Sequence, residues 1–322
     1  MSLSGPSISV VICAYTHARW QALRAAVASV QQQDYAPFEV LVVVDSNPDL
    51  LALVRAELTG VVALDNVGPS GLSGARNTGL RAARGEVVAF LDDDAAAAPD
   101  WLGQLAAAYS SPHVLGVGGR IEPNWLQSPP AWFPMEFAWV VGCSYRGLPT
   151  GRAPVRNLIG ANMSLRRAVF AHVGGFRSEL GHVGTRPGGD EETELCIRIH
   201  QRWPDSVLLY EPRARVHHQV PAARTTWRYF RARCVAEGRA KARVARLVGA
   251  QSGLASERVY ASRTLPSGVL LALVEALLTG QALPLARAAA IVAGLALTAG
   301  AYLAERLRPT PGSSQAALPL AA

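Results

Sequence analysis

The sequence predicts an α/β protein organised around a doubly wound, mostly parallel sheet. Short stretches rich in β-branched residues alternate with segments whose apolar residues recur at helical spacing. This alternation is typical of a parallel sheet that carries helices on both faces. Acidic residues follow several of the predicted strands, at Asp45, Asp65 and Asp92–Asp94. Because ligands of such sheets bind beyond the carboxyl ends of the strands, these acids mark a candidate site.

The predicted elements follow one another in a regular order. Residues 8–15 form a short β-branched stretch, which is typical of a buried parallel strand. Residues 120–157 hold many prolines and tryptophans and are predicted to be loop-rich, and regular patterning returns near Leu158. Further strands are predicted over 39–44, 61–64 and 86–91, and helices over 19–33, 48–58 and 71–83.

Composition narrows the class of protein. Half of the 322 residues are hydrophobic and 17% are charged, which excludes a largely disordered chain. The net charge of +7 is local, because residues 213–246 hold ten Arg or Lys residues against one acid, Glu237. Lys241 is the only lysine, and arginine suits phosphate binding because its planar fork engages two oxygens. We expect the basic stretch to favour anionic lipid headgroups, and we expect no nucleic-acid partner.

The cysteines and the N-terminus indicate the compartment. Cys13, Cys143, Cys196 and Cys234 form no CxxC pair, so neither a zinc ribbon nor a disulfide framework is expected. Buried thiols in a reducing compartment are predicted instead. The first residues lack the charged region and the cleavage site of a signal peptide, so the chemistry is expected to face the cytoplasm.

Asp92-Asp93-Asp94 directly follows a predicted strand. Three adjacent carboxylates repel one another, and a hard divalent cation best explains them at a strand end. In an extended segment Asp92 and Asp94 point the same way and Asp93 the other, so Asp92 and Asp94 are the predicted metal clamp. The competing interpretation is a solvated acidic turn.

Three other polar clusters each allow more than one interpretation and become informative only when they are considered together. The segment 190–194 follows a Gly-Gly pair and contains four acids, which could supply a general base or the ordinary acidic bias of a first helical turn. His217-His218 follows a predicted strand and could complete a metal site. A Gly-rich segment that ends at Arg76 and Asn77 precedes a helix, but it lacks the spacing of dinucleotide sites.

Taken in order, these motifs resemble glycosyltransferase family 2 with a GT-A fold, an inverting family that carries a DXD motif. The resemblance covers residues 8 to about 220 and points to the bacterial non-processive type with a C-terminal apolar helical extension. Processive members carry Gln-x-x-Arg-Trp, whereas Gln201-Arg202-Trp203 has a different spacing, so one sugar per encounter is expected. The matching segments are 10–16, 42–46, 74–79, 90–94, 160–167, 174–176, 191–195 and 216–218.

The resemblance implies roles for individual residues. A Mg²⁺ or Mn²⁺ ion that bridges the donor diphosphate is implied at Asp92 and Asp94, with His218 as the late histidine ligand and His217 as the second choice. Asn162 and Gly175, in the matching segments, are candidate substrate contacts. The implied nucleotide-binding residues are Ala14, Tyr15, Thr16, Asp45 and Arg76, with Asp93 near the ribose.

The resemblance also implies the catalytic base. Anchoring on Thr193-Glu194-Leu195 places it at Glu192, where the family usually has aspartate, and Glu191 and Asp190 remain alternatives. The base would take a proton from an acceptor hydroxyl while in-line displacement inverts the sugar. Arg228 and Arg231 could add positive charge at the leaving group, or they could lie on a solvated or lipid-facing helix.

The expected reaction moves one sugar from a nucleotide-diphosphate sugar, with UDP favoured over GDP and dTDP, to a carbohydrate or lipid-linked acceptor in cell-envelope polysaccharide or glycolipid synthesis. Two alternatives compete with it. A sugar-phosphate nucleotidyltransferase would need a Gly-rich phosphate loop after the first strand, which residues 13–16 do not provide. A membrane-attached, non-catalytic GT-A scaffold would tolerate Glu192 in place of aspartate. The Trp125–Trp139 segment could stack on sugar rings or pack in the core.

The C-terminal region is strongly apolar. Two apolar helices are predicted over 265–283 and 285–304, with Pro284 between them. They could span the membrane as a hairpin, lie in its interface, or pack on the catalytic domain or a second subunit. Membrane association is favoured, since Arg258 and Arg263 precede the pair and Arg306 and Arg308 follow it, although Arg287 near the turn opposes deep insertion. We expect the protein at the cytoplasmic face of the cell membrane.

These observations predict the domain organisation. Residues 1–222 are the expected GT-A catalytic domain, with a nucleotide-binding half over 1–110 and an acceptor half over 111–222. A basic helical segment over 223–263, an apolar hairpin over 264–308 and a disordered tail over 309–322 complete the chain.

Overall fold

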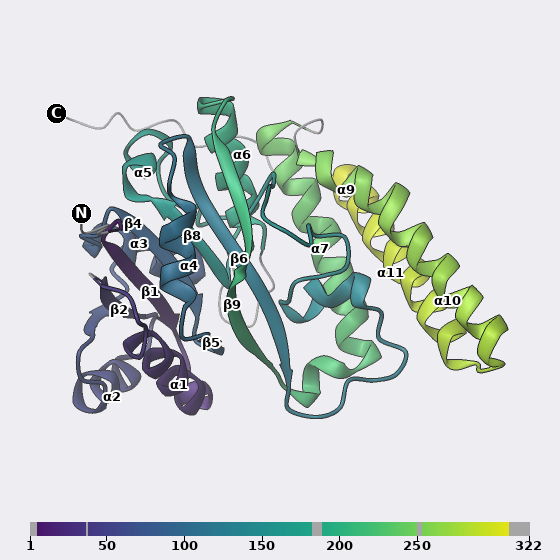
Figure 1. The fold of residues 1–322 in the computed structure, drawn as a ribbon, viewed down its shortest axis with the longest axis horizontal. Helices are drawn as coiled ribbons and strands as arrows, with labels where there is room; N and C mark the ends of the chain where they lie inside the picture. Colours follow the sequence, from purple (N-terminus) through teal and green to yellow (C-terminus); the bar gives the residue numbers. More distant parts are fainter. Residues whose placement is uncertain (1–4, 37, 182–188, 250–252, 309–322) are drawn as a thin grey trace.

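The computed structural model describes residues 5–36, 38–181, 189–249 and 253–308, so the predicted tail lies outside the described residues. One sheet runs through residues 8–220 in the order β3-β2-β1-β4-β8-β6-β9-β5, with β7 paired to β9 (Figure 1). Helices cover both of its faces, which confirms the predicted α/β class.

The first half of the sheet is parallel. β1 (Ile8–Ala14) lies between β2 (Phe38–Val44) and β4 (Val87–Asp92), and β3 (Val62–Asp65) forms the edge. Each of these strands lies within two residues of its predicted bounds. The helices between them are α1 (Trp20–Gln31), which follows the short 3-10 helix η1 (His17–Arg19), α2 (Pro48–Glu57) and α3 (Leu72–Ala82).

The second half of the sheet is mixed. β8 (Asn162–Arg166) runs antiparallel to both β4 and β6 (Val114–Trp125). β9 (Val207–Val220) runs parallel to β6 and antiparallel to β5 (Ala95–Ala97) and β7 (Ala153–Pro154). The remaining elements of this half are α4 (Trp101–Ala108), α5 (Arg167–Val173), α6 (Glu191–Arg202) and two 3-10 helices, η2 (Met135–Val141) and η3 (Ala222–Thr225).

The expectation that 120–157 is loop-rich is wrong at its beginning, because β6 continues to Trp125 through Pro123. β6 pairs with β8 only over Gly116–Gly118, so at Pro123 a single neighbour, β9, lies alongside. A proline is tolerated where one edge of a strand needs no ladder hydrogen bond.

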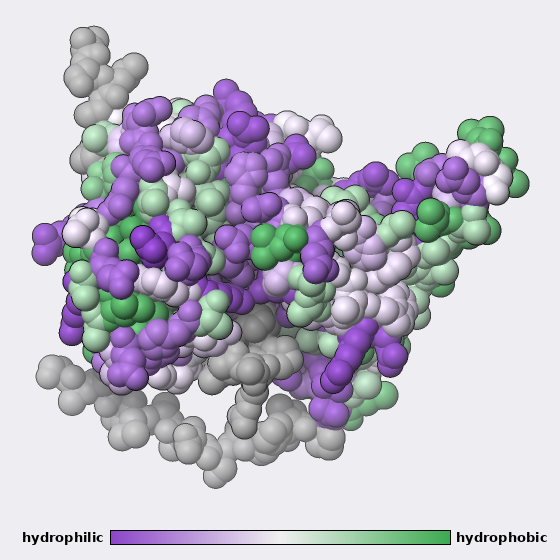
Figure 2. Space-filling view, turned by 90° about the horizontal axis from the view of Figure 1, so that it is seen from below, coloured by the Kyte–Doolittle hydropathy of each residue, from purple (hydrophilic) through white to green (hydrophobic). Residues whose placement is uncertain are grey.

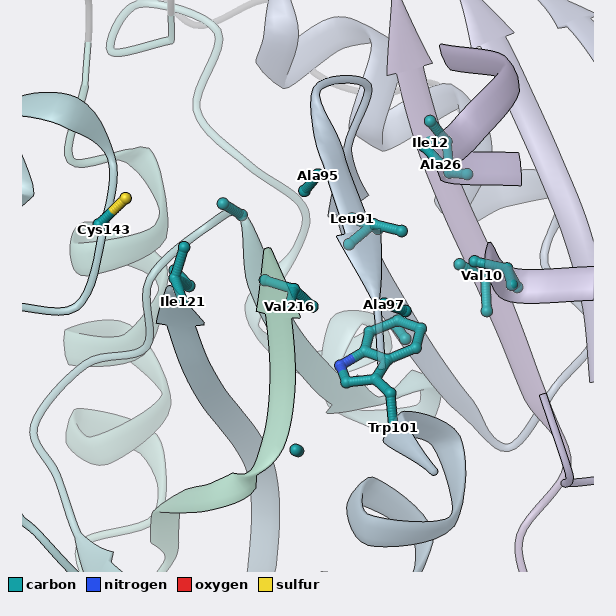
Figure 3. Packing of buried hydrophobic residues seen from close by; sticks show 14 of the residues in the cluster. Val10, Ile12, Ala26, Leu91, Ala95, Ala97, Trp101, Ile121, Cys143 and Val216 are labelled. Atoms are coloured by element: carbon teal, nitrogen blue, oxygen red, sulfur yellow. The ribbon is translucent and has the colours of Figure 1, made fainter. Parts of the chain in front are cut away.

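The core forms on both faces of the sheet because alternate side chains of each strand point to opposite sides. Val10 and Ile12 of β1 pack with Ala26 of α1 and Trp101 of α4 on one face, and Figure 3 shows Trp101 beside Leu91 and Ala97. Val11, on the other face, packs in a cluster with residues of α3 and α6. Each face of the sheet is therefore covered by an apolar layer.

The C-terminal helices pack beside the sheet-containing body and end in a projecting arm (Figure 1). α7 (Trp227–Val248) leads to α9 (Ala255–Val259), the π-helical turn η4 (Tyr260–Thr264), α10 (Leu265–Thr279) and α11 (Leu283–Arg306). α11 packs on α7 where Gly238 meets Thr298, and a Cβ at Gly238 would lie 2.2 Å from the Thr298 carbonyl oxygen. α10 and the first half of α11 project from the body, with apolar side chains along the arm (Figures 1 and 2). Two helices, Ser256–Thr279 and Leu283–Arg306, are long and apolar enough to cross a membrane by length and composition.

Candidate active site

A cavity of about 550 Å³ lies at the carboxyl ends of the parallel strands and extends to the C-terminal helices. Asp45 after β2 and Asp92 at the end of β4 line one side, and the first turn of α6 lines the middle. Tyr229 of α7, Tyr260 of η4 and Leu295 of α11 line the far side. The cavity therefore connects the strand ends, where ligands of such sheets bind, with the apolar arm.

The acidic run reaches the cavity because the chain turns directly after β4. β4 ends at Asp92, the turn contains Asp93 and Asp94, and β5 then pairs with β9 so that Ala95 lies opposite His218. The candidate ligand atoms of Asp92, Asp94 and His218 lie within 4.8 Å of one another. The expected pairing of Asp92 and Asp94 is present, but a turn produces it rather than an extended segment.

These three residues fit a hard divalent cation. Two carboxylates and one imidazole suit Mg²⁺ or Mn²⁺. The buried Oδ2 atom of Asp93, which lies between the two aspartates in the sequence, has no hydrogen-bond partner among the described residues. The neighbouring His217 lies on the opposite side of β9, half-exposed and 3.7 Å from Glu122. The alternation of the strand therefore favours His218 over His217 as the ligand.

Two arginines hold the acidic turn together. Arg19 Nη1 lies 2.7 Å from Asp93 Oδ1 and 3.3 Å from Asp94 Oδ2, and Arg224 Nη2 lies 3.3 Å from Asp94 Oδ2. Burial would raise the pKa of Asp94, but the hydrogen bond from His218 and the surrounding cations lower it overall. Burial raises the pKa of Asp93 to about 7 despite the charge of Arg19. Burial would lower the pKa of His218, but Asp94 raises it to about 10.

Arg76 connects the acidic turn to the start of α6. Its Nη1 lies 2.9 Å from Glu191 Oε1, and its Nη2 lies 3.5 Å from Asp92 Oδ1. Both Arg76 and Glu191 are buried. Burial raises the pKa of Glu191 although Arg76 opposes the shift. Glu191 is therefore committed to an ion pair in this structure.

The three candidate bases differ in their partners. Asp190 is the N-cap residue directly before α6 and has a left-handed conformation, with φ of 68°; its carboxylate lies 2.6 Å from the ammonium group of Lys241. Glu192 lines the cavity, and no hydrogen bond or ion pair joins it to another described residue. Burial, followed by the charge of Glu191, raises the pKa of Glu192 to about 8. Among the three carboxylates, Glu192 is thus the one left available in the described structure.

The expected nucleotide side of the cavity is well defined. Asp45 is buried and accepts hydrogen bonds from the Asn66 side chain at 2.6 Å, the Gly71 backbone N–H at 2.9 Å and the Ser70 hydroxyl at 3.1 Å. Ala14 and Tyr15 line the cavity beside it. Thr16 instead caps η1, where its hydroxyl accepts a hydrogen bond from the Ala18 N–H.

The structure does not bring four of the expected substrate contacts into the cavity. Asn162 is buried and serves the fold, since it accepts from the Trp101 indole and donates to backbone carbonyls of Arg120 and Ala214. Gly175 packs on Asn77, whose Oδ1 would lie 2.2 Å from a Cβ there. Arg228 and Arg231 lie exposed on α7. The expectation that these four residues contact substrate in the cavity is therefore not met in this structure.

Other cations take the place of the expected arginines. Arg224 of η3 and Arg233 of α7 line the cavity, as do Arg19 and Arg156. The basic stretch indicated the region of Arg224, Arg233 and Lys241, but helical phase and the tertiary contacts select these residues. Of the tryptophans in the 125–139 segment, Trp139 lines the cavity, whereas Trp132 packs against Phe230 in the core.

Comparisons with known proteins agree with this geometry. Residues 9–174 match the family model described as Glycosyl transferase family 2. The chain belongs to glycosyltransferase family 2. The membership makes the protein a glycosyltransferase, and it does not favour a nucleotidyltransferase or a non-catalytic scaffold.

Curated relatives of this family 2 glycosyltransferase include two proteins that match along most of their length. A glucosyl-dolichyl phosphate glucuronosyltransferase of Haloferax volcanii is 37% identical over 230 residues, which are 70% of this chain and 73% of that protein. The succinoglycan biosynthesis protein ExoM of Rhizobium meliloti is 25% identical over 243 residues, 74% of each chain.

Solved structures show the same GT-A fold. The mannosyltransferase PcManGT of Pyrobaculum calidifontis, in complex with GDP-Man and Mn²⁺, matches 92% of this chain and 88% of its own, with a TM-score of 0.55 and 16% identity. GalNAc-T7 with UDP, GalNAc and Mn²⁺ matches 68% of this chain and 45% of its own, with a TM-score of 0.51 and 22% identity.

Proposed function

We propose that this glycosyltransferase is metal-dependent and inverting, and that it transfers one sugar from a nucleotide-diphosphate sugar to an acceptor hydroxyl. One observation carries the proposal. Glu192, which has no ion pair among the described residues, lines the same cavity as the cluster Asp92, Asp94 and His218. A base and a diphosphate-binding cluster in one cavity are what displacement at a sugar carbon requires.

The donor binds at the strand ends in this proposal. Asp45, Ala14, Tyr15 and Arg76 line that part of the cavity and would contact the nucleotide. Solved structures of the same fold hold UDP or GDP-Man, which supports a nucleoside-diphosphate sugar as the donor class. UDP is the favoured nucleotide, with GDP and dTDP as alternatives.

Asp92, Asp94 and His218 would hold Mg²⁺ or Mn²⁺. A divalent cation supplies charge stabilisation for a departing diphosphate. Arg19 and Arg224, which lie against Asp93 and Asp94, keep the acidic turn compact and add positive charge near the leaving group.

Glu192 acts as the general base. Its raised pKa makes it a stronger base than a solvated carboxylate, which favours proton removal from a sugar hydroxyl. The ion pair of Glu191 with Arg76 and that of Asp190 with Lys241 hold the two neighbouring carboxylates in place. Attack from the face opposite the leaving diphosphate then inverts the anomeric carbon.

The proposed acceptor is a lipid-linked sugar, in cell-envelope polysaccharide or glycolipid synthesis. The Haloferax relative is named for a glucosyl-dolichyl phosphate acceptor, and the cavity of this chain extends to its apolar arm. The arm exposes leucines that have no cover in the described structure, which marks an interaction surface. They are Leu270, Leu271, Leu273, Leu277, Leu278, Leu283 and Leu285.

The length of the arm favours insertion into one leaflet. α10 has 15 residues, which span about 22 Å, less than the roughly 30 Å hydrocarbon core of a bilayer. The residues just before α10 contact the body of the protein and do not lengthen the arm. Glu257 forms an ion pair with Arg156, and the Tyr260 hydroxyl donates a hydrogen bond to the Glu136 carbonyl. Arg258, Arg263, Arg306 and Arg308 flank the arm and favour the cytoplasmic face.

A transfer assay tests the proposal. The full chain in detergent is given UDP-, GDP- or dTDP-linked sugars with Mn²⁺ and a glucosyl polyisoprenyl phosphate acceptor. We expect one donor to yield product, with an inverted anomeric configuration by NMR, and we expect EDTA to abolish the reaction. Retention of configuration would overturn the inverting mechanism, and activity in EDTA would overturn the metal requirement.

A further inference from the structure

The far end of the cavity is built by the C-terminal helices rather than by the sheet. Tyr229 and Arg233 of α7, Tyr260 of η4, and Leu295 and Tyr302 of α11 line it. Charged residues line the cavity from the strand ends to Arg233 on α7, whereas α11 contributes Leu295, Ala299 and Tyr302. These three are spaced along one face of α11, since residues three and four apart in a helix are neighbours.

The cationic side chains that line the cavity differ in whether they have an ion-pair partner. Arg19 and Arg224 pair with the acidic turn, and Arg76 pairs with Glu191. Lys241 pairs with Asp190, and Arg156 with Glu257. Among the cavity-lining cations that the structure describes, Arg233 is the one with neither an ion pair nor a hydrogen bond to another described residue. It is half-buried, and Glu237, one turn later on α7, interacts with its charge but forms its ion pair with Lys241, at 3.3 Å.

The cavity leads out along the apolar face of α11. Leu295 lines the cavity and is also 38% exposed, which places it at the mouth. Beyond it, α11 continues toward the tip of the arm, where Val292 and Leu285 are exposed. An unpaired guanidinium inside, followed by an apolar path to the surface of the arm, matches a phosphate attached to a hydrocarbon chain.

We propose that Arg233 binds the phosphate of a polyisoprenyl-phosphate-linked acceptor and that the α11 face of Leu295, Ala299 and Tyr302 receives the first isoprenoid units. This inference rests on the proposed lipid-linked acceptor and adds the site that holds it. The C-terminal helices thus have two roles: they form the projecting arm, and they form part of the acceptor site. The acceptor enters along α11, with its sugar directed toward Glu192.

Binding of a matched pair of small lipids tests the inference. Farnesyl phosphate and farnesol differ only in the phosphate, and their affinities for the full chain in detergent can be measured by microscale thermophoresis. We expect the wild type to prefer farnesyl phosphate by about tenfold or more, the change that roughly 1.4 kcal/mol produces. Arg233→Met should remove this preference, whereas Arg231→Met, an exposed arginine of the same helix, should keep it.

A second pair of variants tests the lipid path. Leu295→Asp should weaken binding of farnesyl phosphate, whereas Leu303→Asp, an exposed leucine of α11 that does not line the cavity, should leave it unchanged. Inorganic phosphate in excess should not compete, which distinguishes a lipid phosphate from the free anion. Equal loss in Arg231→Met and Arg233→Met, an unchanged Arg233→Met, or efficient competition by inorganic phosphate would each overturn the inference.

Metal-dependent donor hydrolysis, measured on the same preparations, separates this inference from the proposed function. If the protein hydrolyses the donor but does not prefer farnesyl phosphate over farnesol, the proposed transferase activity is supported and the proposed acceptor site is overturned. The preference without hydrolysis of any nucleotide sugar would support the acceptor site and contradict the proposed donor chemistry. A melting temperature of Arg233→Met close to that of the wild type is the control for correct folding of the variant.

Discussion

The ammonium group of Lys241 lies 2.6 Å from the carboxylate of Asp190, the left-handed N-cap residue of α6. Lys241 also lies 3.1 Å from Glu257, which precedes the apolar arm. The only lysine of the chain thus joins the helix that carries the candidate base to the C-terminal helices. Burial would lower the pKa of Lys241, but the surrounding carboxylates raise it well above its usual value, so the ammonium stays charged.

Removal of this cation should destabilise the fold. Lys241→Met leaves Asp190 buried beside other acids without its cation, and breaking a buried pair in this way costs about 3–5 kcal/mol. We expect a melting temperature lower by several degrees, with partial recovery in the Lys241→Met/Asp190→Asn double variant. The matched control is Arg239→Met, at an exposed position of the same helix. Identical melting of Lys241→Met and wild type would show that the pair contributes no stability.

The same cluster predicts sensitivity to acid. Burial would raise the pKa of Glu257, but Lys241 and Arg156 lower it to about 2. Because the folded-state pKa lies below the unfolded value, Glu257 stabilises the fold above about pH 4.5 and loses this contribution as the pH falls toward 2. Urea unfolding across this range should show a shallower pH dependence in Glu257→Gln than in the wild type. An equal slope in both proteins would contradict the assignment.

Glu192 should control the pH dependence of catalysis. The base works in its deprotonated form, so kcat/KM should rise with pH and level off above about 8. Glu192→Gln should lower kcat by roughly 10²–10⁴-fold, and binding of the donor nucleotide should be retained. The Asp190→Asn and Glu191→Gln variants, measured alongside, compare the other two candidates. If Glu192→Gln retained the wild-type rate, the base would have to be sought among them.

The metal cluster should be required for donor binding. In thermal melts, Mn²⁺ together with the cognate nucleoside diphosphate should stabilise the wild type, because a ligand that binds only the folded state raises the melting temperature. Asp94→Asn and His218→Ala should remove this stabilisation. Asp49→Asn, an exposed acid on α2, serves as the control. Full stabilisation of Asp94→Asn would exclude it as a ligand.

The exposed leucines of the arm should hold the protein on membranes. Leu277 and Leu278 are 85% and 82% exposed. Replacing both with glutamate would oppose entry of the arm into hydrocarbon by several kcal/mol. A Leu277→Glu/Leu278→Glu variant should lose flotation with anionic vesicles. Val67→Glu, which changes an exposed apolar residue far from the arm in sequence, should float like the wild type. Flotation of the double variant would overturn membrane insertion of the arm.

The sequence alone predicted the fold class, the parallel half of the sheet and the residues near the strand ends. These features depend on local patterns, since β-branched stretches form strands and a strand end fixes where Asp45 and Asp92 lie. The same reasoning named Asp92, Asp94 and His218 as the metal candidates, and the structure brings them together.

Tertiary structure decided which side chains share the cavity. The pairing of β5 with β9 places His218, and not His217, beside Asp94, and no local pattern specifies a pairing between strands so distant in sequence. Helical phase and packing on α11 bring Arg233 and Lys241 of the basic stretch to the cavity and leave Arg228 and Arg231 in solvent. The sequence determined which elements form, and long-range packing selected the side chains that meet, because burial and charge pairing depend on neighbours that are remote in the chain.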